Sequence, residues 1–275
     1  MIDLHSHILP ALCDGAQNLE TSLQMARMAV ADGTTHLACT PHIYPGLYEN
    51  TTELIEQARV NLQAELDKQA IPLTLIIGAD IQLSPKVMRG LKNGSMPTLN
   101  HSRYFLLEPS HHVAVTDLAE QVANFINAGF VPIITHPERL HWIEDHYSVF
   151  VESVKRGAWI QITAGAITGI FGKTAKKYAE RFLKEGLVHI IASDAHNIEQ
   201  RSPILSTAIT AAGTILGNEK LVLPMVTTIP QAVLENTDPL SIGARFQSPS
   251  SMQYLKHASN DATIVSKSWF SKFFH

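Results

Sequence analysis

Two histidines stand two positions apart near the start of the chain, at His5 and His7. In an extended strand, residues i and i+2 point to the same face, so these two imidazoles can bind one metal ion. The same spacing returns at Asp194 and His196, directly behind the apolar run 188–192. One such pair is weak evidence, but two pairs that each follow an apolar segment predict a metal site built from strand ends.

Five further candidate ligands lie behind other apolar runs or in a turn, namely Asp14, His42, Asp80, Glu108 and His136. Taken singly, such a histidine more often satisfies a local hydrogen bond, and an acid in a Cys-Asp-Gly sequence more often makes a turn. A buried acid needs a compensating cation, however, and the repetition at equivalent positions favours metal. Nine nitrogen and oxygen ligands exceed the four of a tetrahedral site and predict two or three divalent ions, with Mn, Fe, Zn and Mg all compatible.

The segments that must position these ligands alternate between strand-like and helix-like. The predicted strands are short apolar runs rich in β-formers, at 2–7, 36–40, 73–77, 104–108, 131–135, 159–163 and 189–192. The predicted helices, most of which end at glycine, are 19–31, 52–69, 115–128, 147–155, 174–184 and 204–216, with a shorter one near 85–91. This alternation predicts an α/β fold of parallel strands with helical crossovers, closed as a distorted barrel or open as a sheet. In such barrels the active site lies at the C-terminal ends of the strands, where the candidate ligands fall, although run 159–163 offers none.

The composition is that of a globular domain. The 275 residues are 45% hydrophobic and 17% charged, and the formal net charge of −4 gives no basic footprint for nucleic acid. Two cysteines, Cys13 and Cys39, are too few for a disulfide framework and favour the reducing cytoplasm. The chain shows neither a signal-peptide pattern at its start nor an apolar run long enough to span a membrane.

The last segment, 241–275, differs from the domain that we expect over 1–240. It carries four Lys or Arg residues and one acid, is rich in serine, and ends in an aromatic cluster around Trp269 and Phe270. A packed or frayed C-terminal extension is the simpler interpretation. The alternative is a basic and aromatic segment that makes weak contact with a membrane surface or binds a partner.

Five motifs of the chain resemble those of the PHP superfamily, named for polymerase and histidinol phosphatase. They are His5-x-His7, Thr40-Pro41-His42, Gly78-Ala79-Asp80, Thr135-His136-Pro137-Glu138-Arg139 and Ser193-Asp194-Ala195-His196-Asn197. In order and spacing they are most similar to the bacterial metal-dependent protein-tyrosine phosphatases of capsule and exopolysaccharide gene clusters. The resemblance implies a distorted (β/α)7-type barrel that holds three metal ions, with manganese the expected metal.

The resemblance also implies which ligands share an ion. Asp80 would bridge two of the ions, although the family usually has glutamate at this place. Because aspartate is one methylene shorter, bridging then needs a small backbone shift or a different spacing of the metals. The implied sets are His5, His7, Asp80 and Asp194 for one ion, Asp80, Glu108 and His136 for a second, and Asp14, His42 and His196 for a third.

Metals suit the hydrolysis of phosphomonoesters, which is among the slowest uncatalysed reactions. They lower the pKa of bound water from about 15.7 towards 7, so we expect a metal-bound hydroxide to attack phosphorus in line. Arg139 and Arg201 each lie just beyond a ligand-bearing strand end, and guanidinium groups match phosphate bidentately. Salt bridges to Glu138 or Glu199 are the alternative for these arginines, and the resemblance favours contact with substrate.

The substrate that the resemblance implies is phosphotyrosine in a protein, with a membrane-associated bacterial tyrosine kinase of polysaccharide export as the expected partner.

A cysteine-dependent phosphatase mechanism is disfavoured. Cysteine-dependent tyrosine phosphatases need a Cys-x5-Arg motif, but the residue at the arginine position is Leu19 after Cys13 and Pro45 after Cys39. Two alternatives stay open. One is a small-molecule phosphatase of the histidinol phosphatase type or another PHP phosphoesterase, and the other is a non-catalytic metal-binding scaffold. An amidohydrolase, which would usually carry a carboxylated lysine on a central strand, is disfavoured. His111 and His112 could line the mouth of the site, with a solvated loop the simpler interpretation. Aromatic contacts for a phenyl ring could come from Tyr44, Tyr48 and Phe171, with core or surface packing the simpler interpretation.

Overall fold

The structure, a computed structural model, describes residues 1–246, with side chains described as far as Ile242. Nine parallel strands form two sheets, of order β1-β2-β4 and β3-β5-β6-β7-β8-β9. The strands are β1 (Ile2–Ser6), β2 (His36–Cys39), β3 (His42–Ile43), β4 (Thr74–Ile77), β5 (Asp80–Gln82), β6 (Tyr104–Glu108), β7 (Val131–Thr135), β8 (Trp159–Thr163) and β9 (Ile190–Ala192). The predicted α/β fold with parallel strands is confirmed, while most of the expected extension lies outside the described residues, from 247 onwards.

The two sheets join into a ring of seven strand positions. The chain of β2 resumes as β3 after Thr40-Pro41, and β4 resumes as β5 after Gly78-Ala79. Pro41 has no backbone N–H, so the hydrogen-bond ladder breaks between β2 and β3, and the two interrupted strand positions distort the ring. At the other edge β9 meets β1, since the backbone N–H of His7 donates to the carbonyl of Ala195 at 2.8 Å.

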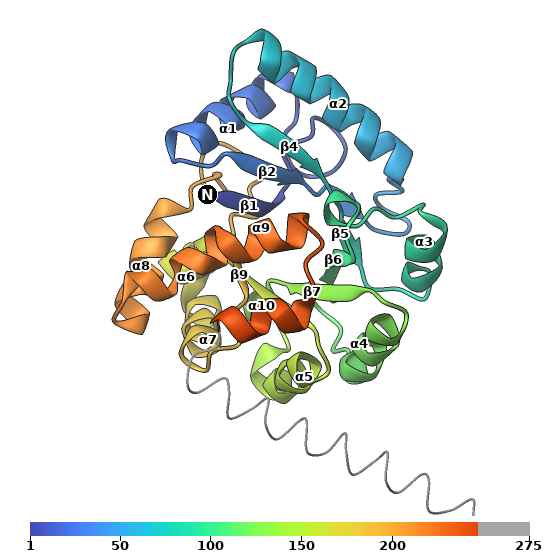
Figure 1. Ribbon diagram of the computed structural model, residues 1–275, viewed down its shortest axis with the longest axis vertical. Helices are drawn as coiled ribbons and strands as arrows, with labels where there is room; N and C mark the ends of the chain where they lie inside the picture. Colours follow the sequence, from blue (N-terminus) through green and yellow to red (C-terminus); the bar gives the residue numbers. More distant parts are fainter. Residues whose placement is uncertain (247–275) are drawn as a thin grey trace, which may run out of the picture.

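Helices surround this ring (Figure 1). They are α1 (Leu19–Ala31), α2 (Thr52–Lys68), α3 (Val87–Asn93), α4 (Leu118–Asn127), α5 (Ile143–Lys155), α6 (Ala164–Thr168), α7 (Gly172–Lys184), α8 (Ser206–Leu216), α9 (Thr228–Leu234) and α10 (Pro239–Phe246). In α1 the side chain of Asn18 caps the first turn by accepting from the N–H of Thr21, and the small residues Ser22, Ala26 and Ala29 bury one face at helical spacing. Within residues 1–246, no helix is long and apolar enough to cross a membrane.

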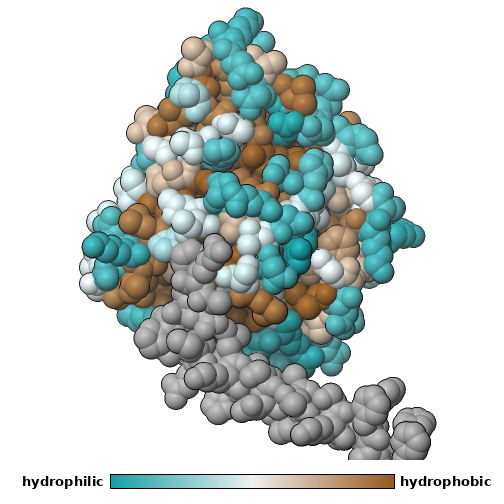
Figure 2. All heavy atoms as spheres, in the orientation of Figure 1, coloured by the Kyte–Doolittle hydropathy of each residue, from teal (hydrophilic) through white to brown (hydrophobic). Residues whose placement is uncertain are grey.

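The interior of the ring is filled at the N-terminal ends of the strands. Strand side chains such as Leu4 and Leu106 pack there with Ile229 and Val233 of α9 and with Ile242 of α10. Figure 1 shows α9 and α10 lying across this face, and Figure 2 shows the same face closed by side chains. Because α9 and α10 cover this end, the carboxyl ends of the strands at the opposite end are left for a functional site.

Candidate metal centre

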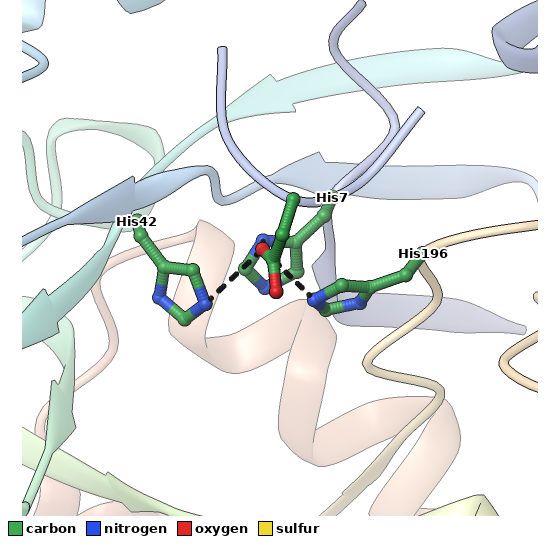
Figure 3. A group of neighbouring side chains, drawn as sticks. His7, His42 and His196 are labelled. Carbon is green, nitrogen blue, oxygen red and sulfur yellow. Dashed lines mark ion pairs between the residues drawn. The ribbon is translucent and has the colours of Figure 1, made fainter. Parts of the chain in front are cut away.

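All nine predicted ligands lie together at the carboxyl ends of the strands. Seven are buried, whereas the side chains of Asp14 and His42 remain 47% and 14% exposed. Figure 3 shows His7, His42 and His196 converging from three separate segments of the chain. The Nε2 atoms of His42 and His196 lie 3.5 and 3.4 Å from Asp14 Oδ1, so these three residues form one compact group.

A second group forms around the histidine pair of β1. His5 Nε2 and His7 Nε2 are 3.2 Å apart, and each lies 3.4 Å from Asp194 Oδ1. Asp80 Oδ2 lies 3.5 Å from His5 Nε2 on the other side. Donors that are each about 2.1 Å from one ion lie about 3.4 Å apart in a tetrahedral arrangement. The observed spacings therefore match those expected for side chains that bind one ion.

The third group joins β5, β6 and the residue after β7. His136 Nε2 lies 3.7 Å from both Asp80 Oδ2 and Glu108 Oε1. His42 Nδ1 approaches the same acids, at 3.5 Å from Asp80 Oδ2 and 3.4 Å from Glu108 Oε2. The carboxylates of Asp80 and Glu108 therefore lie between histidines of two groups, which keeps the three groups in direct contact.

Several atoms of these groups are buried without a hydrogen-bond partner, which tests whether the residues fit metal ions. They include Asp80 Oδ2, Glu108 Oε2, His42 Nδ1 and His196 Nε2. Burying an unpaired polar atom, above all a charged one, costs free energy, and a divalent cation would supply the missing partner. The donors are imidazole and carboxylate, which suit hard to borderline divalent metals. The residues therefore fit a multinuclear metal centre.

The pKa values reflect the same crowding of charge. Burial lowers the pKa of His136 to about 4, which keeps its imidazole neutral, the form that binds metal. Burial also acts to lower the pKa of His5 and His42, but the neighbouring carboxylates outweigh it and raise both to about 9. Although burial opposes ionisation of Asp194, the nearby Arg201 and His5 hold its pKa well below the usual range. The raised pKa values of His5 and His42 therefore reflect the negative charge of the nearby carboxylates, which a bound metal ion would neutralise in place of the protons.

The backbone is adapted locally to aim these ligands. His136 and Asp194 have φ values of 34° and 52°, in the left-handed region that most non-glycine residues avoid. Gly15 lies against the ligand strand, where an added Cβ would be 2.1 Å from the carbonyl oxygen of His7. Only glycine therefore allows the turn that carries Asp14 to approach His7 this closely.

Two polar side chains on strands β7 and β8 contact the expected ligands, although no pattern in the sequence predicts this. Gln161 Oε1 lies 2.8 Å from His5 Nδ1, and accepting that proton leaves Nε2 of His5 free for metal. Thr135 Oγ1 donates to Asp80 Oδ1 at 3.2 Å. Strand β8, which carries no predicted ligand, thus contributes an orienting residue through Gln161.

The two predicted phosphate-binding arginines meet at one carboxylate. Arg139 and Arg201 both donate to Asp194 Oδ2, Arg201 at 2.6 Å. The Phe171 ring stacks against both guanidinium groups, with centroid distances of 4.2 Å to Arg139 and 5.8 Å to Arg201. Salt bridges from these arginines to Glu138 or Glu199, the alternative that the sequence left open, are not among the ion pairs of the described residues. Arg201 Nε is buried without a partner and keeps one donor available.

Comparison with known proteins places this geometry in a family. The model of the capsular polysaccharide synthesis family CpsB/CapC matches residues 1–235. The chain belongs to this family. Tyrosine-protein phosphatase YwqE of Bacillus subtilis (strain 168) is 37% identical over 239 residues, which cover 86% of this chain and 92% of YwqE. Tyrosine-protein phosphatase CpsB of Streptococcus pneumoniae is 30% identical over 225 residues, which cover 80% and 93% of the two chains.

The solved structures of the CpsB/CapC family agree with this assignment. A chain from the crystal structures of YwqE and CpsB, described as unique metal-dependent tyrosine phosphatases, matches with a TM-score of 0.81 at 32% identity, covering 86% of this chain and 96% of that one. An amidohydrolase from Mycoplasma synoviae, at a TM-score of 0.53 and 11% identity, shares the fold alone. The resemblance predicted from the motifs is confirmed.

In this member of the CpsB/CapC family, the cysteines are poorly suited to nucleophilic chemistry. Burial raises the pKa of the Cys13 thiol to about 11, and Cys39 is fully buried in the core, where burial raises its pKa as well. The ring of Tyr48 stacks on His42 at 5.8 Å. His111, whose place the sequence left open, lies at the centre with Nε2 3.4 Å from Glu108 Oε1.

Proposed function

We propose that this chain is a metal-dependent protein-tyrosine phosphatase. The observation that carries the proposal is the pair Arg139 and Arg201, held at Asp194 on the rim of a nine-ligand centre. Ligands alone would serve many metalloproteins, whereas two guanidinium groups beside them are arranged to bind an oxyanion such as a phosphate. The names and structures of the family members YwqE and CpsB support the same activity.

The nine ligands would hold two or three divalent ions, and manganese is the metal that we propose. When bound, such ions neutralise phosphate charge and lower the pKa of water. The spacings described above support one ion for each group, with Asp80 shared between two of them. The proposed sets are His5, His7, Asp80 and Asp194 for one, Asp80, Glu108 and His136 for another, and Asp14, His42 and His196 for the third.

The protein's own contribution to catalysis would be to bind and orient the phosphate. Arg201 Nε is a buried donor without a partner, and each guanidinium has further N–H groups besides the one that reaches Asp194. The Phe171 ring supports both arginines from one side, which limits their rotamers. A phosphate bound there would lie next to the metal ligand Asp194 and so close to the metal centre.

A protein substrate is favoured over a small molecule by the surroundings of the centre. Large apolar side chains are exposed at Leu47, Val113 and Ile198, in loops that follow strands, and at Ile170, between α6 and α7. Apolar side chains around a polar centre can contact residues that flank a phosphotyrosine. The partner that we propose is a membrane-associated bacterial tyrosine kinase of polysaccharide export, in keeping with the family's description.

The experiment that tests this function compares substrates and inhibitors. Purified protein with added Mn²⁺ should hydrolyse phosphotyrosine peptides faster than histidinol phosphate. A chelator should abolish the activity, while iodoacetamide should leave it intact because both thiols have raised pKa values. Loss of activity to iodoacetamide but not to chelator would refute a metal-based reaction. Faster turnover of histidinol phosphate would identify a small-molecule phosphatase, and bound metal without any hydrolysis would identify a scaffold.

A further inference from the structure

His111 lies with two of the expected ligands of one ion. Its Nε2 is 3.4 Å from Glu108 Oε1, the same oxygen that lies 3.7 Å from His136 Nε2. One donor atom from each of these three residues lies within 4.8 Å of the others, and the rings of His111 and His136 are 5.1 Å apart. These separations resemble those within the other groups of the centre.

Asp80 directs only one of its two oxygens at the histidines, so it cannot offer a separate oxygen to each of two ions. Its Oδ1 accepts a hydrogen bond from the Thr135 hydroxyl at 3.2 Å. Only Oδ2 faces the histidines, at 3.5 Å from His5 and His42 and 3.7 Å from His136. A carboxylate that bridges with one oxygen for each ion must direct one oxygen at each of them, and here Oδ1 points to Thr135 instead. The group of Glu108 and His136 therefore lacks one independent donor.

The loop that carries His111 is anchored, which distinguishes this ring from a solvated side chain. Trp142 Nε1 donates to the carbonyl of Ser110 at 2.8 Å, and the backbone N–H of His141 donates to the carbonyl of His111 at 3.0 Å. Both partners lie just before or at the start of α5. The His111 side chain is 28% exposed, so most of its surface is covered at the centre.

We propose that His111 is a ligand of the ion held by Glu108 and His136, where it supplies the donor that Asp80 does not. With His111, that ion would have three side chains of its own plus the shared Asp80 Oδ2, so four protein donors would surround it. The inference rests on the proposed metal centre but not on the identity of the substrate.

The test measures metal binding rather than turnover. Wild type, His111→Ala and His112→Ala are stripped of metal and titrated with Mn²⁺, and bound metal is counted by elemental analysis after dialysis. His112 is the matched control, because its exposed ring lies 3.0 Å from His141 Nδ1, and the centre of the ring is 6.5 Å from that of His111. In His111→Ala, one equivalent should bind at least about 10-fold more weakly, which is the loss that removing even an orienting partner of a ligand causes, and the other equivalents should be unchanged. Circular dichroism of each variant checks that it folds.

A second variant tests why the ligand is needed. Asp80→Glu adds one methylene and would let the carboxylate offer the ion of Glu108 and His136 an oxygen that it does not share with His5, so in the His111→Ala background it should restore most of the lost affinity. Equal binding in His111→Ala and wild type would overturn the proposal, as would an equal loss in His112→Ala. Unchanged metal binding with a raised KM would make His111 a substrate contact instead. Loss of metal in His111→Ala from a protein that cleaves no phosphotyrosine would leave this inference standing and remove only the proposed function.

Discussion

Removing one of the two arginines that contact Asp194 should slow the hydrolysis of phosphotyrosine without loss of metal from the centre. Arg139 and Arg201 donate to the same oxygen, Asp194 Oδ2, so either one can neutralise it alone. In Arg139→Ala, Arg201 stays at 2.6 Å, and Asp194 Oδ1 keeps its positions 3.4 Å from His5 and His7. The ligand geometry therefore survives, whereas one donor to the phosphate is lost.

The size of the effect follows from the contact removed. A hydrogen bond between charged groups contributes about 1.5 to 3 kcal/mol. Since each 1.36 kcal/mol is a factor of ten, kcat/KM should fall about 10- to 150-fold in Arg139→Ala. The double variant with Arg201→Ala leaves Asp194 Oδ2 buried without an arginine, and the loss of a buried charge partner costs about 3 to 5 kcal/mol. Its metal-free form should therefore unfold at a clearly lower temperature than either single variant.

The assay combines steady-state kinetics on a phosphotyrosine peptide with metal content of the same samples. Arg156→Ala is a matched control, because Arg156 is exposed at the end of α5 and pairs only with Glu152 among the described residues. It should retain wild-type kcat/KM and metal content. A single variant that loses metal would show that the arginine acts through Asp194 rather than on phosphate. Unchanged kcat/KM in both single variants would refute the phosphate-binding role altogether.

Three further predictions concern the centre and the stability of the fold. Gly15→Ala should cost one equivalent of metal, because the added Cβ would push the turn of Asp14 away from His7, and full metal content would contradict this. Burial lowers the pKa of His189 from 6.5 to about 4. Between these two pH values the unfolded chain is protonated at His189 and the folded chain is not. The free energy of unfolding should therefore fall by roughly 3 kcal/mol as the pH decreases from 6.5 to 4. In urea unfolding of the metal-free protein at pH 7.5 and pH 5, the free energy of unfolding should change less with pH in His189→Leu than in the wild type. An equal change in both proteins would contradict this prediction. Chelation should lower the free energy of unfolding by about 3 kcal/mol for each ion present at 100 times its dissociation constant, and an unchanged melting temperature would exclude bound ions.

The strands and most helices could be predicted because their patterns are local. All seven predicted strand positions are present, and α1 spans the residues expected for it, Leu19–Ala31. The short strands β3 and β5 were not predicted, because each is a continuation that only pairing with a neighbour stabilises. Helices α6, α9 and α10 were also missed, since two of them depend on packing against the closed end of the ring.

The candidate ligands were accessible from sequence, whereas their supporting residues were not. Histidines and acids behind apolar runs are chemically conspicuous, and parallel strands bring their carboxyl ends together. Gln161 lies 156 positions from His5, and its role arises only because β8 is close to β1 in the ring. His111 lacked a distinguishing pattern, because a histidine in a loop gives no indication of where its backbone is anchored.

By itself, the sequence determined which donors exist and that they gather at one end of a parallel αβ ring, because residue type and strand periodicity are written in the chain. Only the tertiary structure decided how those donors are shared. It turned one oxygen of Asp80 towards Thr135 and the other towards three histidines, and it brought both arginines to Asp194. These choices depend on strand register and side-chain direction, and distances of a few ångströms between segments far apart in sequence are set by packing alone.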